Sequence, residues 1–111
     1  MLILKISFEA LFDPKNLAVV RQGMFDVVNK EGATAYGARF TLNGMKMAGK
    51  TATTQVRRIS VEERQKGLKD QTLIPWEHRD HALFAGFAPT NNPKYAVVVV
   101  VEHGIGGSRT A

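Results

Sequence analysis

Apolar residues near the start of the chain recur at helical spacing. Asp13 and Pro14 are typical of a helix beginning, because an aspartate can cap free N–H groups and proline suits the first helical position. The apolar residues that follow stand three, four, three and one positions apart: Leu17, Val20, Met24, Val27 and Val28. This pattern predicts a helix over residues 14–30, ending before Gly32, with that face packed on a sheet as core.

The rest of the pattern favours strands. Residues 48–59, small and β-branched at first, predict a central strand, and residues 80–88 predict a second. Residues 95–101 read Tyr-Ala-Val-Val-Val-Val-Val, which predicts a central strand covered on both faces. Turn residues at 91–94 join the last two strands into an antiparallel hairpin. Asn43-Gly44 predicts another turn, residues 31–37 a tight loop or single helical turn, and residues 61–67 a short exposed helical turn.

These elements predict an α+β fold: an antiparallel sheet of about three strands with one main helix packed on it. A strand buried on both faces needs two covering layers, and the sequence supplies one substantial helix. We therefore interpret residues 1–111 as a single, incomplete domain. Residues 1–12, a strand or an irregular lead-in, are apolar but interrupted by Lys5 and Glu9. They are too short to span a bilayer and lack the features of an export signal.

Composition narrows the function classes. The chain has no cysteine, which excludes disulfides and thiolate metal sites, and its histidines lack metal-ligand spacing, so we expect no metal and no cofactor. With 15 Lys+Arg against 10 Asp+Glu, the net charge of +5 raises the possibility of nucleic acid as a partner. The densest basic group is interrupted by acidic residues, which favours a solvated loop over a binding stripe: Arg57, Arg58, Arg64, Lys66 and Lys69.

The stretch at residues 47–56, Met-Ala-Gly-Lys-Thr-Ala-Thr-Thr-Gln-Val, carries the strongest candidate chemistry. A lysine beside threonine hydroxyls and free backbone N–H groups on a strand edge is suited to binding a carboxylate. The candidate residues are Lys50, Thr51, Ala52 and Thr53.

The same stretch resembles the third signature of the transpeptidase domain of class B penicillin-binding proteins, of the penicillin-binding protein 2 type, which reads Met-Ala-Gly-Lys-Thr-Gly-Thr. Residues 27–29 and 34–37 resemble the segment before that signature, and residues 81–89 and 92–104 the hairpin after it. The likeness runs in order over residues 13–108. It implies the C-terminal part of a serine transpeptidase, β-lactamase-like fold, acting on peptidoglycan stem peptides or binding β-lactams.

The resemblance implies roles for three of the residues. Lys50 would attract the substrate's terminal carboxylate, Thr51 and Thr53 would bind it through their hydroxyls, and the Thr53 backbone N–H would donate to an oxyanion. The family mechanism also needs a nucleophilic serine in Ser-x-x-Lys and a Ser-x-Asn motif. The chain has three serines: Ser7, Ser60 and Ser108. Three positions after them stand Ala10, Glu63 and Ala111, so none forms Ser-x-x-Lys. Two positions after them stand Glu9, Glu62 and Thr110, so none forms Ser-x-Asn.

No catalytic nucleophile is therefore present in these 111 residues, and Ala52 stands where the family has glycine, so its methyl is expected to hinder a substrate lying on the strand. We expect a fragment that is inactive alone, or a subunit that complements a separately encoded N-terminal half. A small basic module for nucleic acid is the alternative. Family members are anchored in the inner membrane and face the periplasm, whereas this chain, without a signal or membrane segment, is expected in the cytoplasm if expressed alone.

Overall fold

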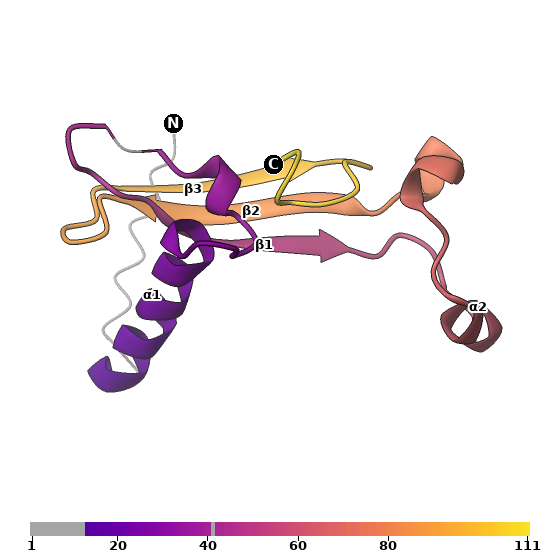
Figure 1. The fold of residues 1–111 in the computed structure, drawn as a ribbon, viewed down its shortest axis with the longest axis horizontal. Coiled ribbons are helices and arrows are strands. Elements are labelled where there is room, and N and C mark those ends of the chain that lie inside the picture. Colours follow the sequence, from indigo (N-terminus) through magenta and orange to yellow (C-terminus); the bar gives the residue numbers. More distant parts are fainter. Residues whose placement is uncertain (1–12, 41) are drawn as a thin grey trace, which may run out of the picture.

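A computed structural model describes residues 13–40 and 42–111 (Figure 1). In chain order the elements are α1 (Pro14–Asn29), the 3-10 turn η1 (Tyr36–Ala38), β1 (Ala48–Thr54), α2 (Val61–Lys66), the 3-10 turns η2 (Gln71–Leu73) and η3 (Trp76–His78), β2 (His81–Ala88) and β3 (Tyr95–Val101). The three strands form one antiparallel sheet in the order β1-β2-β3. The predicted α+β class, with about three strands and one main helix, is confirmed.

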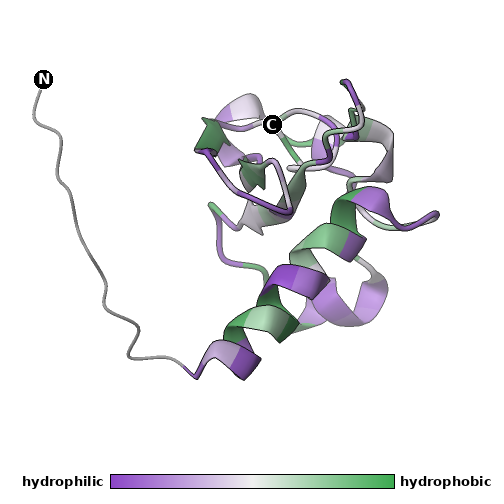
Figure 2. Ribbon diagram, turned by 90° about the vertical axis from the view of Figure 1, so that its left-hand side faces the viewer, coloured by the Kyte–Doolittle hydropathy of each residue, from purple (hydrophilic) through white to green (hydrophobic). Residues whose placement is uncertain are grey.

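Helix α1 begins where the sequence predicts. Asp13 caps it, because its carboxylate accepts a hydrogen bond from the backbone N–H of Lys15 at 2.9 Å. The prediction that its whole apolar face is core is wrong, since Leu17 is 39% and Val20 58% exposed. Figure 1 shows why: α1 runs obliquely away from the strands, so its first turns lie off the sheet and only the C-terminal half reaches the core at Val28. Polar and apolar stretches alternate along this helix in Figure 2.

The strand predicted over residues 48–59 ends at Thr54, and among the described residues it lies at an edge of the sheet. Thr54 pairs with His81, the first residue of β2, so the residues after Thr54 have no ladder partner. The central position belongs to β2 instead.

The prediction that residues 95–101 form a central strand covered on both sides is also wrong within the described residues. Strand β3 lies at the opposite edge of the sheet, and several of its side chains are 46–75% exposed: Tyr95, Val97, Val98 and Val100. Among the described residues, helix α1 makes its main sheet contacts with β1, and Val99 and Val101 of β3 are half-buried while the other five side chains of the strand are exposed.

The core lies where the C-terminal half of α1 and the segment before η1 meet the sheet. Val28, Ala35 and Phe84 are buried together, and Met47 and Ala111 pack against them. Ala35 also donates its N–H to the carbonyl of Val27 at 3.0 Å, which fixes the tight loop expected over residues 31–37. The core is small, and it sits directly beside the start of β1.

The predicted turns are present. Asn43 and Gly44 have positive φ values of 53° and 76°, as a type I′ turn requires, and Met45 donates to the carbonyl of Leu42 at 2.9 Å. Residues 89–94 join β2 to β3 as the expected hairpin, and α2 is the expected short exposed helix. Among residues 13–40 and 42–111, none of the helices has the length and apolar character needed to cross a membrane.

Candidate functional site

The edge of β1 that faces away from β2 carries the candidate residues. In an antiparallel ladder, successive residues direct their N–H and C=O groups alternately toward the partner strand and away from it. The carbonyl of Lys46 accepts from Thr90 N at 3.1 Å, and Val56 N donates to the Asp80 carboxylate at 3.2 Å. Both contacts lie on the β2 side, so even-numbered residues face β2.

Odd-numbered residues of β1 therefore face outward. The carbonyl of Met47 accepts from the Asn29 side chain of α1 at 2.8 Å, on the side away from β2. By the same alternation, Thr51 and Thr53 direct their backbone N–H and C=O groups to the edge that carries no strand partner among the described residues. The Lys50 ammonium reaches this edge too, since its Nζ donates to the carbonyl of Thr51 at 2.6 Å.

The four candidate side chains do not share one face. Side chains alternate along a strand, so Lys50 and Ala52 lie on one face, and Thr51 and Thr53 on the other. Thr51 stands opposite Phe84 and is only 7% exposed, whereas Thr53 is exposed. The structure thus brings the candidate groups together at the edge of the strand, through backbone groups and the flexible lysine, rather than on one surface.

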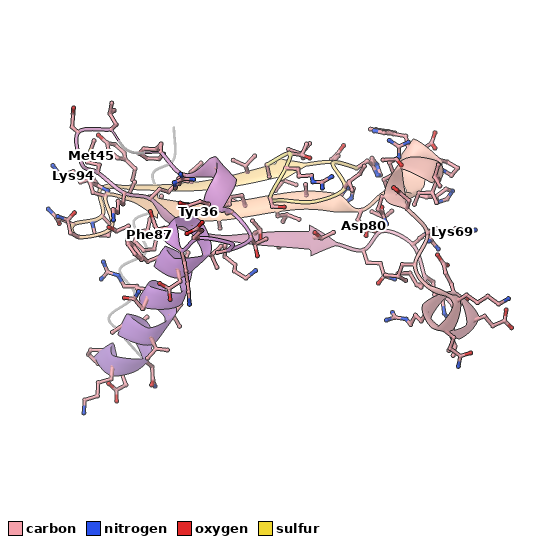
Figure 3. The ribbon with its side chains drawn as sticks, viewed as in Figure 1. Tyr36, Met45, Lys69, Asp80, Phe87 and Lys94 are labelled. Atoms are coloured by element: carbon pink, nitrogen blue, oxygen red, sulfur yellow. The ribbon has the colours of Figure 1, made fainter. Side chains whose placement is uncertain are left out.

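Two polar residues that the sequence reading missed hold β1 in position. Asn29, the last residue of α1, donates through Nδ2 to the carbonyls of Phe25 at 2.9 Å and Met47 at 2.8 Å. Asp80 holds the other end of the strand through Val56 N, and its own carbonyl accepts from Ile105 N at 2.9 Å. Figure 3 shows Asp80 far from Phe87, at the opposite end of the sheet. The position of Asn29 at the end of a predicted helix, just before a loop that contains glycine, could have marked it as a capping residue.

The strand is also fixed by a ring packed on glycines. Gly49 and Gly86 are directly paired across β1 and β2, and the buried ring of Phe84 lies over both. The absence of side chains at these two positions makes room for the ring, in the way that an aromatic residue covers a glycine in a sheet. Gly49 precedes Lys50, so this packing fixes the backbone immediately before the candidate residues.

The two histidines next to the strand ends, His81 and His103, bind backbone groups and pack against rings in the adjoining loops. The backbone N–H of His103 donates to the ring nitrogen Nδ1 of His81 at 2.9 Å. The ring nitrogen Nδ1 of His103 lies 2.9 Å from the backbone carbonyl oxygen of Arg79. The rings of Trp76 and His103 are 4.3 Å apart between centroids. The sequence suggested Asp80 or Glu102 as partners, but the observed partners are backbone groups and rings. Within the described residues, no group of three His, Cys, Asp or Glu side chains could hold a metal.

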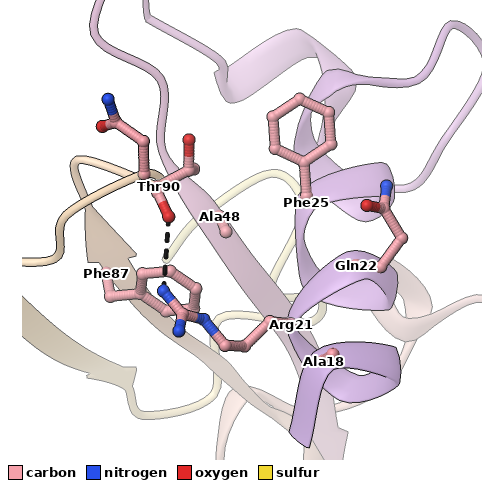
Figure 4. Close-up of a pocket in the computed structure, with 8 residues that line it drawn as sticks. Ala18, Arg21, Gln22, Phe25, Ala48, Phe87 and Thr90 are labelled. Carbon is pink, nitrogen blue, oxygen red and sulfur yellow. Dashed lines mark hydrogen bonds between the residues drawn. The ribbon is translucent and has the colours of Figure 1, made fainter. Parts of the chain in front are cut away.

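A hollow of about 330 Å³ lies between α1 and the start of β1 (Figure 4). Its walls include Phe25, Phe87 and Ala48, and Arg21 lies across it with Nη2 donating to the carbonyl of Thr90 at 3.4 Å. The candidate residues at 50–53 do not line it. The hollow lies at the contact between α1 and the sheet, and it does not include the candidate edge of β1.

The basic group at residues 57–69 contains an internal ion pair. Arg57 pairs with both carboxylate oxygens of Glu63, with Nη1 2.8 Å from Oε2. This hydrogen-bonded guanidinium lowers the pKa of the Glu63 carboxyl to about 2, and the same contact raises the pKa of Arg57. One of the five basic residues is therefore paired with a carboxylate of the same chain.

Comparisons with known proteins agree with one another. Residues 9–111 match the family model described as the penicillin binding protein transpeptidase domain. The chain is 39% identical over 95 residues to the peptidoglycan D,D-transpeptidase MrdA of Haemophilus influenzae, covering 82% of this chain and 13% of that protein. It is 35% identical over 89 residues to the Escherichia coli K12 protein of the same name, covering 80% of this chain and 13% of the relative.

Solved structures give the same result. The chain is similar to Pseudomonas aeruginosa PBP2 in complex with WCK 5153, with a TM-score of 0.62 and 39% identity, covering 91% of this chain and 18% of that one. It is also similar to Helicobacter pylori PBP2 in complex with MreC, with a TM-score of 0.61 and 37% identity, covering 85% and 14% of the two chains. The chain spans about an eighth of the length of the curated relatives it matches.

Proposed function

Because the chain belongs to the penicillin-binding protein transpeptidase family, as a segment of the penicillin-binding protein 2 type, we propose that β1 forms the substrate-binding wall of a D,D-transpeptidase site. In this proposal an extended stem peptide, or a β-lactam that imitates it, lies along the open edge of β1. Its terminal carboxylate meets the Lys50 ammonium at that edge, where the exposed hydroxyl of Thr53 also lies, and its reacting carbonyl meets the N–H of Thr53.

One observation carries the proposal: the alternation that turns Thr51 and Thr53 toward the unpaired edge. An outward N–H at Thr53 is a preorganised donor for a charge that develops on the reacting carbonyl oxygen. The Lys50 ammonium has three donors, of which the bond to the Thr51 carbonyl uses one. Its charge is thus held at the same edge with donors left for a carboxylate.

We propose that the chain does not react by itself. None of its three serines has a lysine three positions later, so the nucleophile and its base would come from outside these 111 residues. A separately encoded or adjoining segment of the domain would then supply them, on the side of β1 that faces away from β2. The place of action would be that of the family, in membrane-anchored enzymes of the periplasm.

Ala52 is expected to weaken binding. It stands in place of the family's glycine, it is exposed, and its methyl lies on the same face as Lys50. A substrate backbone lying against the strand would meet this methyl, at a cost of about 1–3 kcal/mol for an overpacked contact. We propose that the chain retains the binding edge with reduced affinity.

Two experiments test the proposal. Incubation of the isolated chain with a fluorescent penicillin should give no covalent label after denaturation. A stable label would show that a nucleophile is present and that the serine argument is wrong.

The second experiment follows amide NMR shifts while a stem peptide with a free terminal carboxylate is added. The Thr53 amide should shift, Lys50→Gln should weaken binding about tenfold, and Ala52→Gly should strengthen it by a similar factor. Lys66→Gln, on the exposed helix α2, is the matched control and should change nothing. The binding proposal fails if the C-terminally amidated peptide binds equally well, or if Lys50→Gln behaves like the control.

A further inference from the structure

The end of β1 is fixed by a side chain at a position where the sheet would normally supply a backbone carbonyl. The register between β1 and β2 ends with Thr54 opposite His81. Two residues further along, the same alternation would place the N–H of Val56 opposite the carbonyl of Arg79. In the structure, Val56 N donates instead to Oδ1 of Asp80 at 3.2 Å. A carboxylate oxygen therefore takes the place of a strand carbonyl.

The carbonyl of Arg79 is used by another segment. It lies 2.9 Å from the ring nitrogen Nδ1 of His103, in the loop after β3, and this nitrogen is the donor because a carbonyl oxygen can only accept. The backbone of Asp80 also binds two loops: its N–H donates to Oε1 of Gln71 at 2.9 Å, and its carbonyl accepts from Ile105 N at 2.9 Å. Asp80 thus joins the end of β1 to η2 and to the loop after β3.

Thr53 stands one residue before the end of the ladder, so its orientation depends on how firmly that end is held. Strand ends open locally at little cost in free energy. An N–H that is to stabilise a developing charge must, however, be held in its direction before the reaction begins. Beyond Thr53, the ladder holds β1 at Thr54, and the bond from Val56 to Asp80 holds it two residues further on. That bond therefore closes the end of the strand on the far side of Thr53.

We propose that Asp80 is a positioning residue of the transpeptidase site, whose carboxylate holds the end of β1 so that the outward N–H of Thr53 keeps a fixed direction. This inference rests on the proposed function, because it assigns Asp80 to the same site. The Asp80 carboxylate lies on the β2 side of the strand, whereas the N–H of Thr53 points to the other side. Asp80 therefore acts through the backbone between Val56 and Thr53 and does not touch the substrate.

Amide hydrogen exchange of the full chain tests the tie itself. Asp80→Ala should speed exchange of the Thr54 N–H about tenfold, because a hydrogen bond to a charged group is lost next to it. The Lys50 N–H, further inside the same ladder, should exchange at the wild-type rate, since only the end of the strand opens. The backbone groups of Asp80 that bind Gln71 and Ile105 remain in this variant, so the comparison isolates the carboxylate.

Two further variants separate a lost acceptor from a general loss of stability. Asp80→Asn keeps an acceptor oxygen and should restore slow exchange at Thr54. Asp70→Ala is the matched control, because it removes a carboxylate from the same connection between β1 and β2 that accepts from Thr72 and not from β1. It should leave exchange at Thr54 unchanged.

Addition of the stem peptide then tests the link to the site. The peptide should shift the Thr53 amide resonance of the wild-type chain, and Asp80→Ala should reduce that shift and weaken binding about tenfold, with recovery in Asp80→Asn. If the wild-type chain binds no peptide, the proposed function fails, while the exchange rates still decide whether Asp80 holds the strand.

Four results would each overturn the inference. These are equal exchange at Thr54 in Asp80→Ala and Asp70→Ala, an equal acceleration at Thr54 and Lys50, an Asp80→Asn variant that behaves like Asp80→Ala, and wild-type peptide binding by Asp80→Ala.

Discussion

Gly49→Ala is expected to destabilise the fold, because no room exists for its methyl. A Cβ built at Gly49 would lie against Cζ of Phe84, 2.7 Å from Cε2 of that ring and 2.9 Å from the carbonyl oxygen of Ala85. Carbon atoms in contact normally lie 3.5–4.0 Å apart. The ring cannot simply move away along the sheet, because its other side lies as closely over Gly86, and it is 7% exposed within the core.

The expected cost is that of overpacking, about 1–3 kcal/mol. For a chain of this size, each kcal/mol corresponds to a fall in melting temperature of about 4 °C. Urea unfolding measures the change. The midpoint should fall while the slope against urea stays constant, because the surface exposed on unfolding is unchanged.

Gly37→Ala is the matched control. A Cβ at Gly37 meets no atom within 4 Å, so its effect should stay within about 0.5 kcal/mol. Phe84→Leu removes the obstructing ring atoms, so its combination with Gly49→Ala should cost less than the sum of the two separate changes. The reasoning is refuted if Gly49→Ala unfolds at the same urea concentration as Gly37→Ala, or if the two changes are additive.

Two other predictions concern the ends of the strand and the loop beyond it. Asn29→Ala removes the donor shared by the Phe25 and Met47 carbonyls, which should cost about 1–3 kcal/mol in urea unfolding and speed amide exchange at the start of β1; unchanged exchange there would contradict this role. The pKa of Glu63, lowered to about 2 by Arg57, is below its ordinary 4.5, so the stability it contributes is present above pH 4.5 and is lost as the pH falls toward 2. Glu63→Gln should flatten the dependence of unfolding free energy on pH over that range, and an unaltered slope would show that the ion pair has no such effect.

Local residue chemistry was enough to predict the elements. The cap at Asp13, the turn at Asn43 and Gly44 and the hairpin at residues 89–94 each depend on groups within a few positions of one another, so the sequence alone specifies them. The likeness of residues 47–56 to a transpeptidase signature identified the family in the same way, because a motif is read directly from consecutive residues. Residues 1–12, for which only a weak strand or lead-in was expected, lie outside the described residues.

Order within the sheet was decided by the tertiary structure. An apolar run such as residues 95–101 is compatible with a central or an edge strand, since β-branched residues favour either. Only the pairing places β2 in the middle of the three described strands, with β3 beside it. Likewise, the spacing of Leu17 and Val20 fixes a face of α1 but not how far along the helix the sheet extends.

The candidate edge shows the same division. The sequence alone identified Lys50, Thr51 and Thr53, because their identity and spacing are read directly from it. It also showed that no serine is followed by a lysine three positions later. The direction in which Thr51 and Thr53 turn their backbone groups could not be read from it, since that direction depends on which residues of β1 pair with β2. The contacts of Asn29 and Asp80 at the two ends of the strand fix that register, and they join residues 18 and 24 positions apart.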